Sequence, residues 1–192
     1  MLTSLLSYPF RVFFLSSSAF AITAIAVWLL TLLGVIQLPV SVHWHVHEMF
    51  IGFFQAAVAG FLLTAVCNWT GTSPLTGISL LGLWFVWLAG RLGMLVDTGS
   101  AIAIVVDLLF LPLVIFVACR PIIAKRQWRQ LPILLTLIAT WIADVMFHHS
   151  LDAGWLHLAL ELGVLLMLLV GSRITPVFSR NWLRAQGSDP GV

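Results

Sequence analysis

Three histidines at alternate positions, His43, His45 and His47, open a long apolar segment and are followed at once by Glu48 and Met49. Imidazole nitrogen, carboxylate oxygen and thioether sulfur are all common metal ligands in proteins. At the end of a membrane-length segment such groups must face water or bind something, because burying them unpaired is costly. The segment therefore predicts a metal site, with His45 and His47 as the first candidate ligands.

Two further histidines stand one helical turn from a carboxylate. Asp144 and His148 have this spacing in one predicted helix, and His157 and Glu161 repeat it in the next. The carboxylate can hold the second ring nitrogen of the histidine and strengthen the first as a ligand, or the two can form an ion pair without metal. Two such pairs beside a third histidine cluster favour ligation. We expect His148 and His157 as ligands, and Asp144, Glu161 and Glu48 as outer carboxylates that orient them.

The sequence does not determine the relative directions of His43, His45 and His47. In an extended segment His43, His45 and His47 point the same way, whereas in a helix His45 and His47 diverge by roughly 200°. The helical arrangement would let one histidine bind a cofactor and the other bind a second metal. Imidazole suits haem iron and copper alike, so the ligand type does not choose between a haem, a copper ion and both.

Small residues follow the histidines, and an arginine ends the third predicted span. Gly52, Ala56 and Gly60 recur every four residues, a spacing that lets a neighbouring helix or a flat cofactor approach closely. Helix packing alone is the more frequent reason. Arg91 suits a propionate or another anion, or it could snorkel towards a nearby acid. Gly52 and Arg91, together with Met49, are therefore candidates for cofactor binding.

The composition indicates which kind of fold holds these side chains. The chain has 192 residues, of which 61% are hydrophobic and 8% are charged, whereas soluble domains average about 25% charged residues. An ordinary soluble domain is excluded, and the runs are apolar all round rather than alternating, which predicts helices instead of a barrel. We predict an all-α bundle of about six spans in one domain, residues 1–192. The spans are roughly 11–33, 47–67, 76–96, 100–119, 131–148 and 155–177, followed by a basic tail, 178–192.

The basic residues predict the orientation. Eight of the nine fall at one face, by the rule that Lys and Arg gather on the cytoplasmic side, and only Arg91 falls at the other. Both termini are then cytoplasmic, and the first apolar run is interpreted as an uncleaved span rather than a signal peptide. All six histidines gather at the opposite face. Asp107 lies inside the fourth span, where an acid is a candidate for function, although the sequence does not identify its partner.

Several blocks of the sequence resemble the NnrS family. The first group is long and specific, and the later blocks fall in the expected order over nearly the whole chain. They are Trp44-His45-Val46-His47-Glu48-Met49, Gly52-Phe53, Ala56-Ala57, Gly60-Phe61-Leu62-Leu63-Thr64-Ala65 and Asn68-Trp69-Thr70-Gly71, then Gly90-Arg91, Arg120-Pro121 and Gly171-Ser172-Arg173-Ile174-Thr175-Pro176-Val177-Phe178-Ser179-Arg180-Asn181.

The resemblance implies a multi-pass protein of the bacterial inner membrane that contains haem and copper and is linked to nitric oxide and nitrosative stress. Haem b and copper are the cofactors it implies, and nitric oxide is the small diatomic ligand. Family members typically have about twice as many spans, so we expect this chain to match their N-terminal half. Such a half could form a homodimer that rebuilds the missing part, or keep only a haem site. His45, His47 and His148 match the family pattern, whereas His157 is inferred from its depth alone.

Three functions remain open from the sequence. The first is a haem protein, with or without copper, that binds or detoxifies nitric oxide at an open coordination position. The second is an electron-transfer cytochrome with two axial histidines. The third is a metal-ion transporter whose histidines and acids form a vestibule. The sequence identifies no catalytic residue, so whether the protein is an enzyme stays open. The lipid bilayer is an expected partner, and nucleic acid is not.

Overall fold

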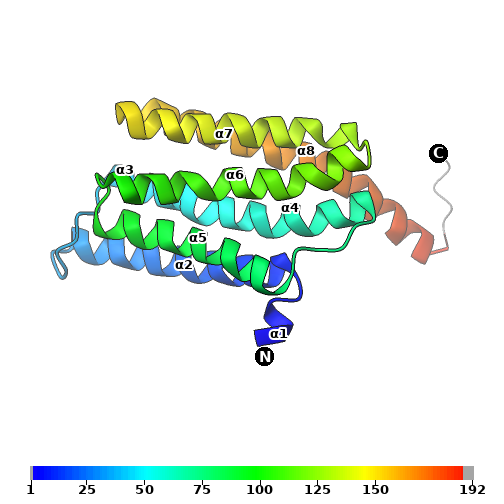
Figure 1. The fold of residues 1–192 in the computed structure, drawn as a ribbon, viewed down its shortest axis with the longest axis horizontal. Coiled ribbons are helices and arrows are strands. Elements are labelled where there is room, and N and C mark those ends of the chain that lie inside the picture. Colours follow the sequence, from blue (N-terminus) through cyan, green and yellow to red (C-terminus); the bar gives the residue numbers. More distant parts are fainter. Residues whose placement is uncertain (1, 188–192) are drawn as a thin grey trace.

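The computed structural model describes residues 2–187, and every regular element in this part of the chain is a helix. Six helical segments there are long and apolar enough to cross a membrane, which confirms the predicted transmembrane helical bundle. They lie side by side along one axis (Figure 1). The elements are α1 (Leu2–Leu5), α2 (Pro9–Leu32), α3 (Val42–His47), η1 (Glu48–Phe54), α4 (Gln55–Thr70), α5 (Gly77–Val96), α6 (Ala101–Ala124), η2 (Trp128–Gln130), α7 (Leu131–Ser150) and α8 (Ala153–Ala185).

The second span consists of three consecutive pieces, α3, the π-helical turn η1 and α4. It begins at Val42, earlier than the predicted residue 47, because the Ser41 hydroxyl accepts a hydrogen bond from the Trp44 amide (3.1 Å) and caps the helix. It ends at Gly71, whose φ of 66° is the left-handed conformation that favours glycine after a helix. The histidines are therefore helical, which decides between the two geometries left open by the sequence.

The last span is longer than the sequence predicts. Helix α8 was expected to end near residue 177, but it continues to Ala185, so most of the described part of the basic tail is helical. The remaining tail residues, 188–192, lie outside the described residues. At its start, the Asp152 carboxylate accepts a hydrogen bond from the Gly154 amide (2.8 Å), which caps the helix.

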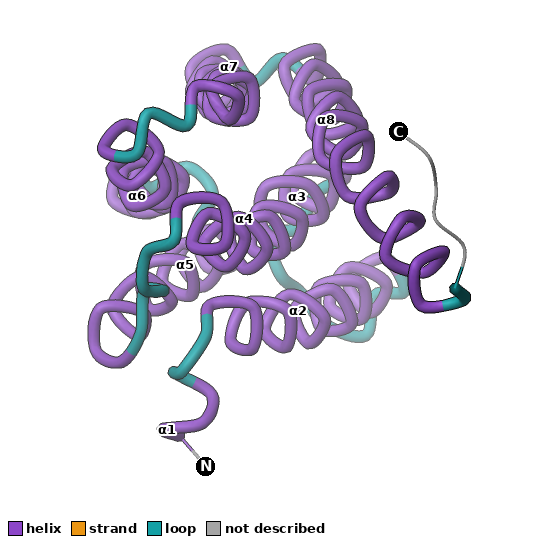
Figure 2. The backbone as a smooth tube through the Cα atoms, turned by 90° about the vertical axis from the view of Figure 1, so that its right-hand side faces the viewer, coloured by secondary structure: helices purple, strands orange, loops and turns teal. Residues whose placement is uncertain are grey.

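Helix α4 lies in the middle of the bundle, with α2 and α6 against it (Figure 2). Helix α5 packs on α6, and α7 packs between α6 and α8. Helix α8 packs mainly on α7 and also contacts η1, and its buried residues are small or apolar: Leu156, Ala159, Gly163 and Leu166. Most of the remaining circumference of α8 is exposed.

The glycines of the second span allow close packing between helices. A Cβ atom at Gly60 would lie 3.0 Å from the Phe13 Cβ and 3.1 Å from the Phe14 ring, both on α2. These distances are shorter than about nine in ten Cβ contacts, so glycine at this position lets α2 lie close to α4. This part of the small-residue stripe serves helix packing.

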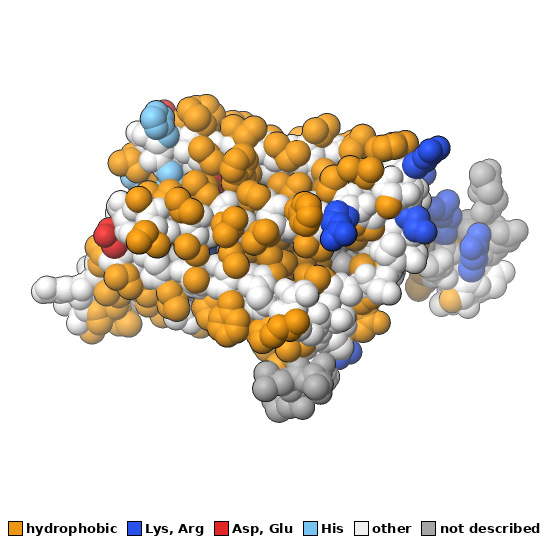
Figure 3. Space-filling model, in the orientation of Figure 1, with side chains coloured by type: hydrophobic (Ala, Val, Ile, Leu, Met, Phe, Trp, Pro, Cys, Tyr) orange, Lys and Arg blue, Asp and Glu red, His pale blue; other side chains and the backbone are white. Residues whose placement is uncertain are grey.

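The two ends of the bundle differ in charge. On the face shown in Figure 3, Lys and Arg side chains lie at one end, and histidine and acidic side chains lie at the other. We call these the basic end and the histidine end. The basic end contains the α6–α7 connection and the arginines of the last turns of α8, and the histidine end contains the start of α3, the end of α7 and the start of α8. The arrangement places the histidines of three helices at one level.

Candidate metal centre

Four side chains from three spans converge in the interior near the histidine end. His47 comes from α3, Asp107 from α6, and Asp144 and His148 from α7, and one potential ligand atom of each lies within 4.8 Å of all the others. The His47 Nε2 atom is 3.1 Å from the Asp144 Oδ1 atom and 3.3 Å from the Asp107 Oδ2 atom. The His148 Nε2 atom is 3.2 Å from the same Asp107 oxygen. We call these four residues the His/Asp cluster.

The burial of the His/Asp cluster is nearly complete. His47 is 1% exposed, and Asp107 and Asp144 are each 2% exposed. Two imidazoles and two carboxylates offer nitrogen and oxygen donors, a set that suits zinc, copper, iron or manganese. The convergence of four such donors at one point is the arrangement that a bound metal ion requires.

Two buried residues outside the cluster hold its ligand atoms in place. The Glu48 Oε1 atom lies 3.0 Å from the His47 Nδ1 atom, so when that nitrogen carries the proton, Nε2 faces the cluster as an acceptor. Arg91 donates to both Glu48 oxygens, at 2.9 and 3.0 Å, and pairs with the Oδ1 atom of Asp107. The other oxygen of Asp107, Oδ2, contacts His47 and His148. This is the carboxylate–histidine arrangement typical of metal sites.

The charges of this group do not balance on their own. Glu48, Asp107 and Asp144 supply three carboxylates against the single guanidinium of Arg91. While both imidazoles are neutral, two net negative charges remain in a part of the bundle that is buried inside a membrane span. Uncompensated buried charge is strongly unfavourable. A divalent cation among the four donors would balance the charge, and so would protonation of both histidines.

A hollow connects the cluster with the histidine end of the bundle. It has a volume of about 240 Å³. His47 and His148 line its inner part, and Ser41, Thr98 and Gly99 come from the loops at that end. An ion or a small diatomic molecule in this hollow would lie beside the two imidazoles.

Glycine at position 52 is required by the ion pair beside the cluster. A Cβ atom there would lie 2.8 Å from both the Arg91 NH1 atom and the Glu48 Oε2 atom, and 2.7 Å from the Phe20 ring. The Gly52 carbonyl also accepts a hydrogen bond from the Trp87 indole (2.9 Å). The structure thus places Gly52 against the carboxylate and guanidinium that orient the cluster.

We expect Gly52→Ala to lower the free energy of unfolding by about 1–3 kcal/mol, the usual cost of overpacking a filled interior. Metal affinity should fall as well, because Glu48 and Arg91 must move. Gly82→Ala is the matched control, since nothing lies within 4 Å of a Cβ atom there. Thermal unfolding and metal titration of both variants test this, and equal behaviour of the two would contradict it.

The structure brings together some of the sequence-predicted site residues and separates others. His47, Glu48, Arg91, Asp144 and His148 lie in or against the cluster. The Asp144 carboxylate, expected to act only as an outer partner, is close enough to His47 to be a ligand itself.

The other predicted residues lie elsewhere. His45 stacks on Trp28 of α2 with ring centroids 4.0 Å apart, as the divergence of two helical histidines requires. Met49 is half-buried in η1 and is outside the cluster. His157 and Glu161 are exposed on α8. Ligand roles for His45 and His157 stay predictions.

Sequence reasoning identified Asp107 as a buried acid but not as a member of the site. The sequence showed that Asp107 is an ionisable residue inside an apolar span. Its partners could not be predicted, because they depend on how α6 is rotated relative to its neighbours. Arg91 does not snorkel to the surface, which was one of the two alternatives from the sequence. It is buried, 4% exposed, and pairs with Glu48 and Asp107.

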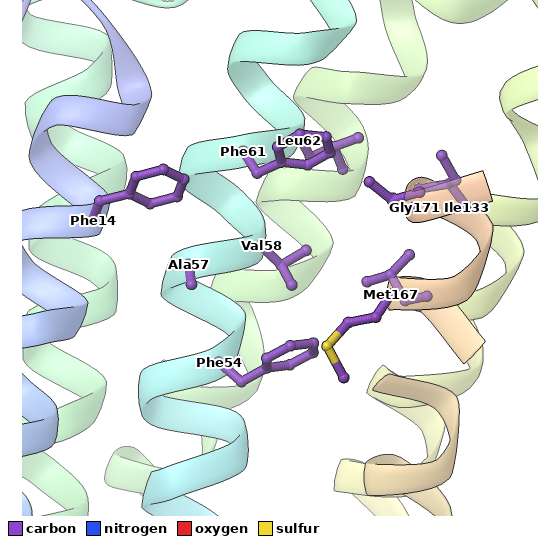
Figure 4. Close-up of a pocket in the computed structure, with 11 residues that line it drawn as sticks. Phe14, Phe54, Ala57, Val58, Phe61, Leu62, Ile133, Met167 and Gly171 are labelled. Atoms are coloured by element: carbon purple, nitrogen blue, oxygen red, sulfur yellow. The ribbon is translucent and has the colours of Figure 1, made fainter. Parts of the chain in front are cut away.

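A porphyrin does not fit between the cluster imidazoles. The His47 and His148 rings have centroids 5.1 Å apart and contact the same two carboxylates, which leaves no gap for a macrocycle. A larger hollow of about 330 Å³ lies between α2, α4, α7 and α8 (Figure 4), but no imidazole lines it, and Met167 is its one sulfur-bearing side chain. The His/Asp cluster therefore fits a single ion, and a haem site elsewhere stays a prediction.

Comparison with known proteins agrees with the resemblance in the sequence. The family model described as NnrS protein matches residues 4–192, so the match spans the whole chain and is not confined to one half of it. No curated protein and no solved structure matches the chain. Because the family match covers far more than half of the residues and includes every member of the His/Asp cluster, the chain belongs to the NnrS family.

Proposed function

We propose that this chain is a membrane metalloprotein that holds one divalent transition-metal ion between His47, Asp107, Asp144 and His148. The observation that carries the proposal is the convergence of four nitrogen and oxygen donors within 4.8 Å in the interior of the bundle. Copper is the ion we put forward first, because the donor set suits it and the family resemblance implies it.

Each neighbouring residue has a separate part in this site. Glu48 fixes the tautomer of His47, and Arg91 holds Glu48 and one oxygen of Asp107, so that the remaining donors face one point. The surrounding helices exclude lipid and bulk water, while the hollow at the histidine end admits an ion or a diatomic molecule. A redox-active ion in this position would supply a coordination site for such a ligand.

We further propose a role in the response to nitric oxide and nitrosative stress, in the bacterial inner membrane. Family membership supports this role, and the hollow beside the two imidazoles suits a ligand as small as nitric oxide. The gathering of basic side chains at one end supports an orientation with both termini cytoplasmic and the metal centre near the periplasmic side. Haem b is proposed on the resemblance alone, at a site distinct from the cluster.

The test is metal analysis and spectroscopy of protein purified from membranes. We expect about one transition-metal ion per chain, a copper electron-spin signal whose splitting shows nitrogen ligands, and a change in that signal when nitric oxide is added. A haem would add an intense visible absorption band. Protein that neither carries a metal nor takes up copper, zinc, iron or manganese above the level of a His47→Ala/His148→Ala variant would overturn the proposal.

Glu48→Gln should lower metal affinity about 10–100-fold without abolishing binding, the usual effect of losing an outer partner of a ligating histidine. The amide keeps the size of the side chain but weakens the hold on the His47 Nδ1 proton and on Arg91. Competition titration with a chelator measures the effect. Unchanged affinity would show that Glu48 does not position His47 for metal binding.

A further inference from the structure

Glu161 lies on the outer surface of α8 at the depth of the hydrocarbon core. It is eight residues after the start of the helix, or about 12 Å at 1.5 Å per residue. Towards the basic end it is twelve residues, or about 18 Å, before Arg173, which pairs there with Gln130 and the Arg129 carbonyl. A bilayer core is about 30 Å thick. In a bilayer of this thickness, the exposed Glu161 carboxyl group would lie within the hydrocarbon core.

The other ionisable groups deep in the spans behave differently. Glu48, Arg91, Asp107 and Asp144 are all buried and all paired with one another or with histidines. Glu161 is exposed and has no ion-pair partner within residues 2–187. An acid in this position is costly in lipid and marks a place where a polar partner is bound.

The residues around Glu161 form one outward face of α8. His157, Glu161, Val164, Leu168, Gly171 and Thr175 follow one another at intervals of four and three residues, so they lie along the same side of the helix. Val164 is 46% exposed and Leu168 is 65% exposed. A Cβ atom at Gly171 would meet nothing within 4 Å, and the residue also lines the hollow of Figure 4, so it lies at the edge of this face. We call these six residues the α8 seam.

We propose that the α8 seam is the contact between two copies of this chain, packed about a two-fold axis along the membrane normal. Such an axis keeps both copies in the same orientation in the membrane, so their α8 helices run parallel. Glu161 of each copy then meets Glu161 and His157 of the other. The imidazole N–H groups can donate hydrogen bonds to the carboxyl oxygens, so the polar part of the seam is complementary to itself.

This interface is independent of the metal centre. The residues of α8 that face the bundle are Leu156, Ala159, Gly163 and Leu166, and the α8 seam lies on another face of the helix. The proposal therefore stands or falls on association between chains, whichever ion the His/Asp cluster binds.

Cysteine cross-linking in the membrane tests the contact. Leu168→Cys places a thiol on the α8 seam, and Met167→Cys places one at the same depth but about 100° around the helix. Both positions are exposed, at 65% and 55%. With a lipid-soluble oxidant, Leu168→Cys should form a disulfide-linked dimer at least tenfold faster than Met167→Cys. The unaltered chain gives the background from Cys67 and Cys119. Equal rates, or none above background, would overturn the proposal.

The contribution of Glu161 is tested by the mass of the purified protein in lipid nanodiscs and by dilution of a fluorescently labelled pair in liposomes. Glu161→Leu should weaken dimerisation about tenfold, the order of effect of one interhelical polar contact in a membrane, and Glu161→Gln should weaken it less because the amide still forms hydrogen bonds. Wild-type protein that is monomeric under these conditions would contradict a contact between copies and would indicate a different partner helix.

Discussion

Replacing His47 by alanine is expected to remove the bound metal from the purified protein. His47 is the residue that contacts both cluster carboxylates and the orienting Glu48, so its loss takes away one donor and the link between the others. Loss of an outer partner alone costs about 10–100-fold in affinity, and loss of a ligand should cost more than 100-fold. Metal content and chelator titration of the purified variant measure this directly.

The matched control is His45→Ala. His45 lies on the same short helix, two residues earlier, but stacks on Trp28 and is outside the cluster. We expect this variant to keep its metal. If His47→Ala retains full metal content, the centre is misassigned. If His45→Ala loses metal while His47→Ala does not, the ion is bound on the α2 side of the helix.

Arg91→Met is expected to have the largest effect on stability. Within residues 2–187, Arg91 is the one guanidinium in contact with Glu48 and Asp107, both of which are buried inside the bundle. Methionine fills a similar volume but leaves both carboxylates without a positive partner. Removing one member of a buried charged group typically costs about 3–5 kcal/mol. Denaturant or thermal unfolding in detergent should show a loss of this size.

Two further variants separate this effect from a general loss of packing. Arg120→Met, at the exposed basic end, should change stability by no more than about 0.5 kcal/mol. Adding Glu48→Gln and Asp107→Asn to Arg91→Met removes the stranded charges and should recover part of the lost stability. A loss below about 1 kcal/mol in Arg91→Met would show that the three groups are not charged together in the folded protein.

The fold follows from the sequence because membrane insertion leaves few alternatives. Apolar runs of sufficient length must form helices, since no water is present to satisfy the backbone. What hydropathy does not determine is where a helix ends in polar surroundings. The second span begins early because Ser41 caps it, and α8 continues beyond the apolar run to Ala185. Caps and amphipathic extensions carry little hydropathy signal, so these boundaries were less predictable.

The candidate site was partly predictable for a different reason. Spacing within one helix identified Asp144 with His148, and adjacency along the chain identified His47 with Glu48. Spacing cannot show how one helix is rotated against another. Asp107 enters the cluster only because of the way α6 lies against α5 and α7, a relation that involves residues far apart in the chain.

The same limit explains why the histidine–carboxylate pair of α7 lies in the cluster whereas the pair of α8 lies on the surface. His157 and Glu161 have the spacing of Asp144 and His148, but α8 turns a face of small residues towards the bundle. At Gly163 a Cβ atom would lie 2.6 Å from the Phe50 ring, so this contact fixes the rotation of the helix. The histidine and the carboxylate are consequently directed outward. A sequence motif of two residues could not reveal this rotation.

The wide turn η1 has a consequence for the ligands that precede it. A π-helical turn holds one more residue than an α-helical turn, and such turns are frequent at functional sites. In a regular helix each residue advances the direction of the side chain by about 100°. Removing one residue from Glu48–Phe54 would therefore rotate His47 by about 100° around the helix axis relative to α4, away from α6 and α7. The additional residue therefore sets the rotation of α3 relative to α4, so that His47 faces the His/Asp cluster while α4 packs against α2 and α6.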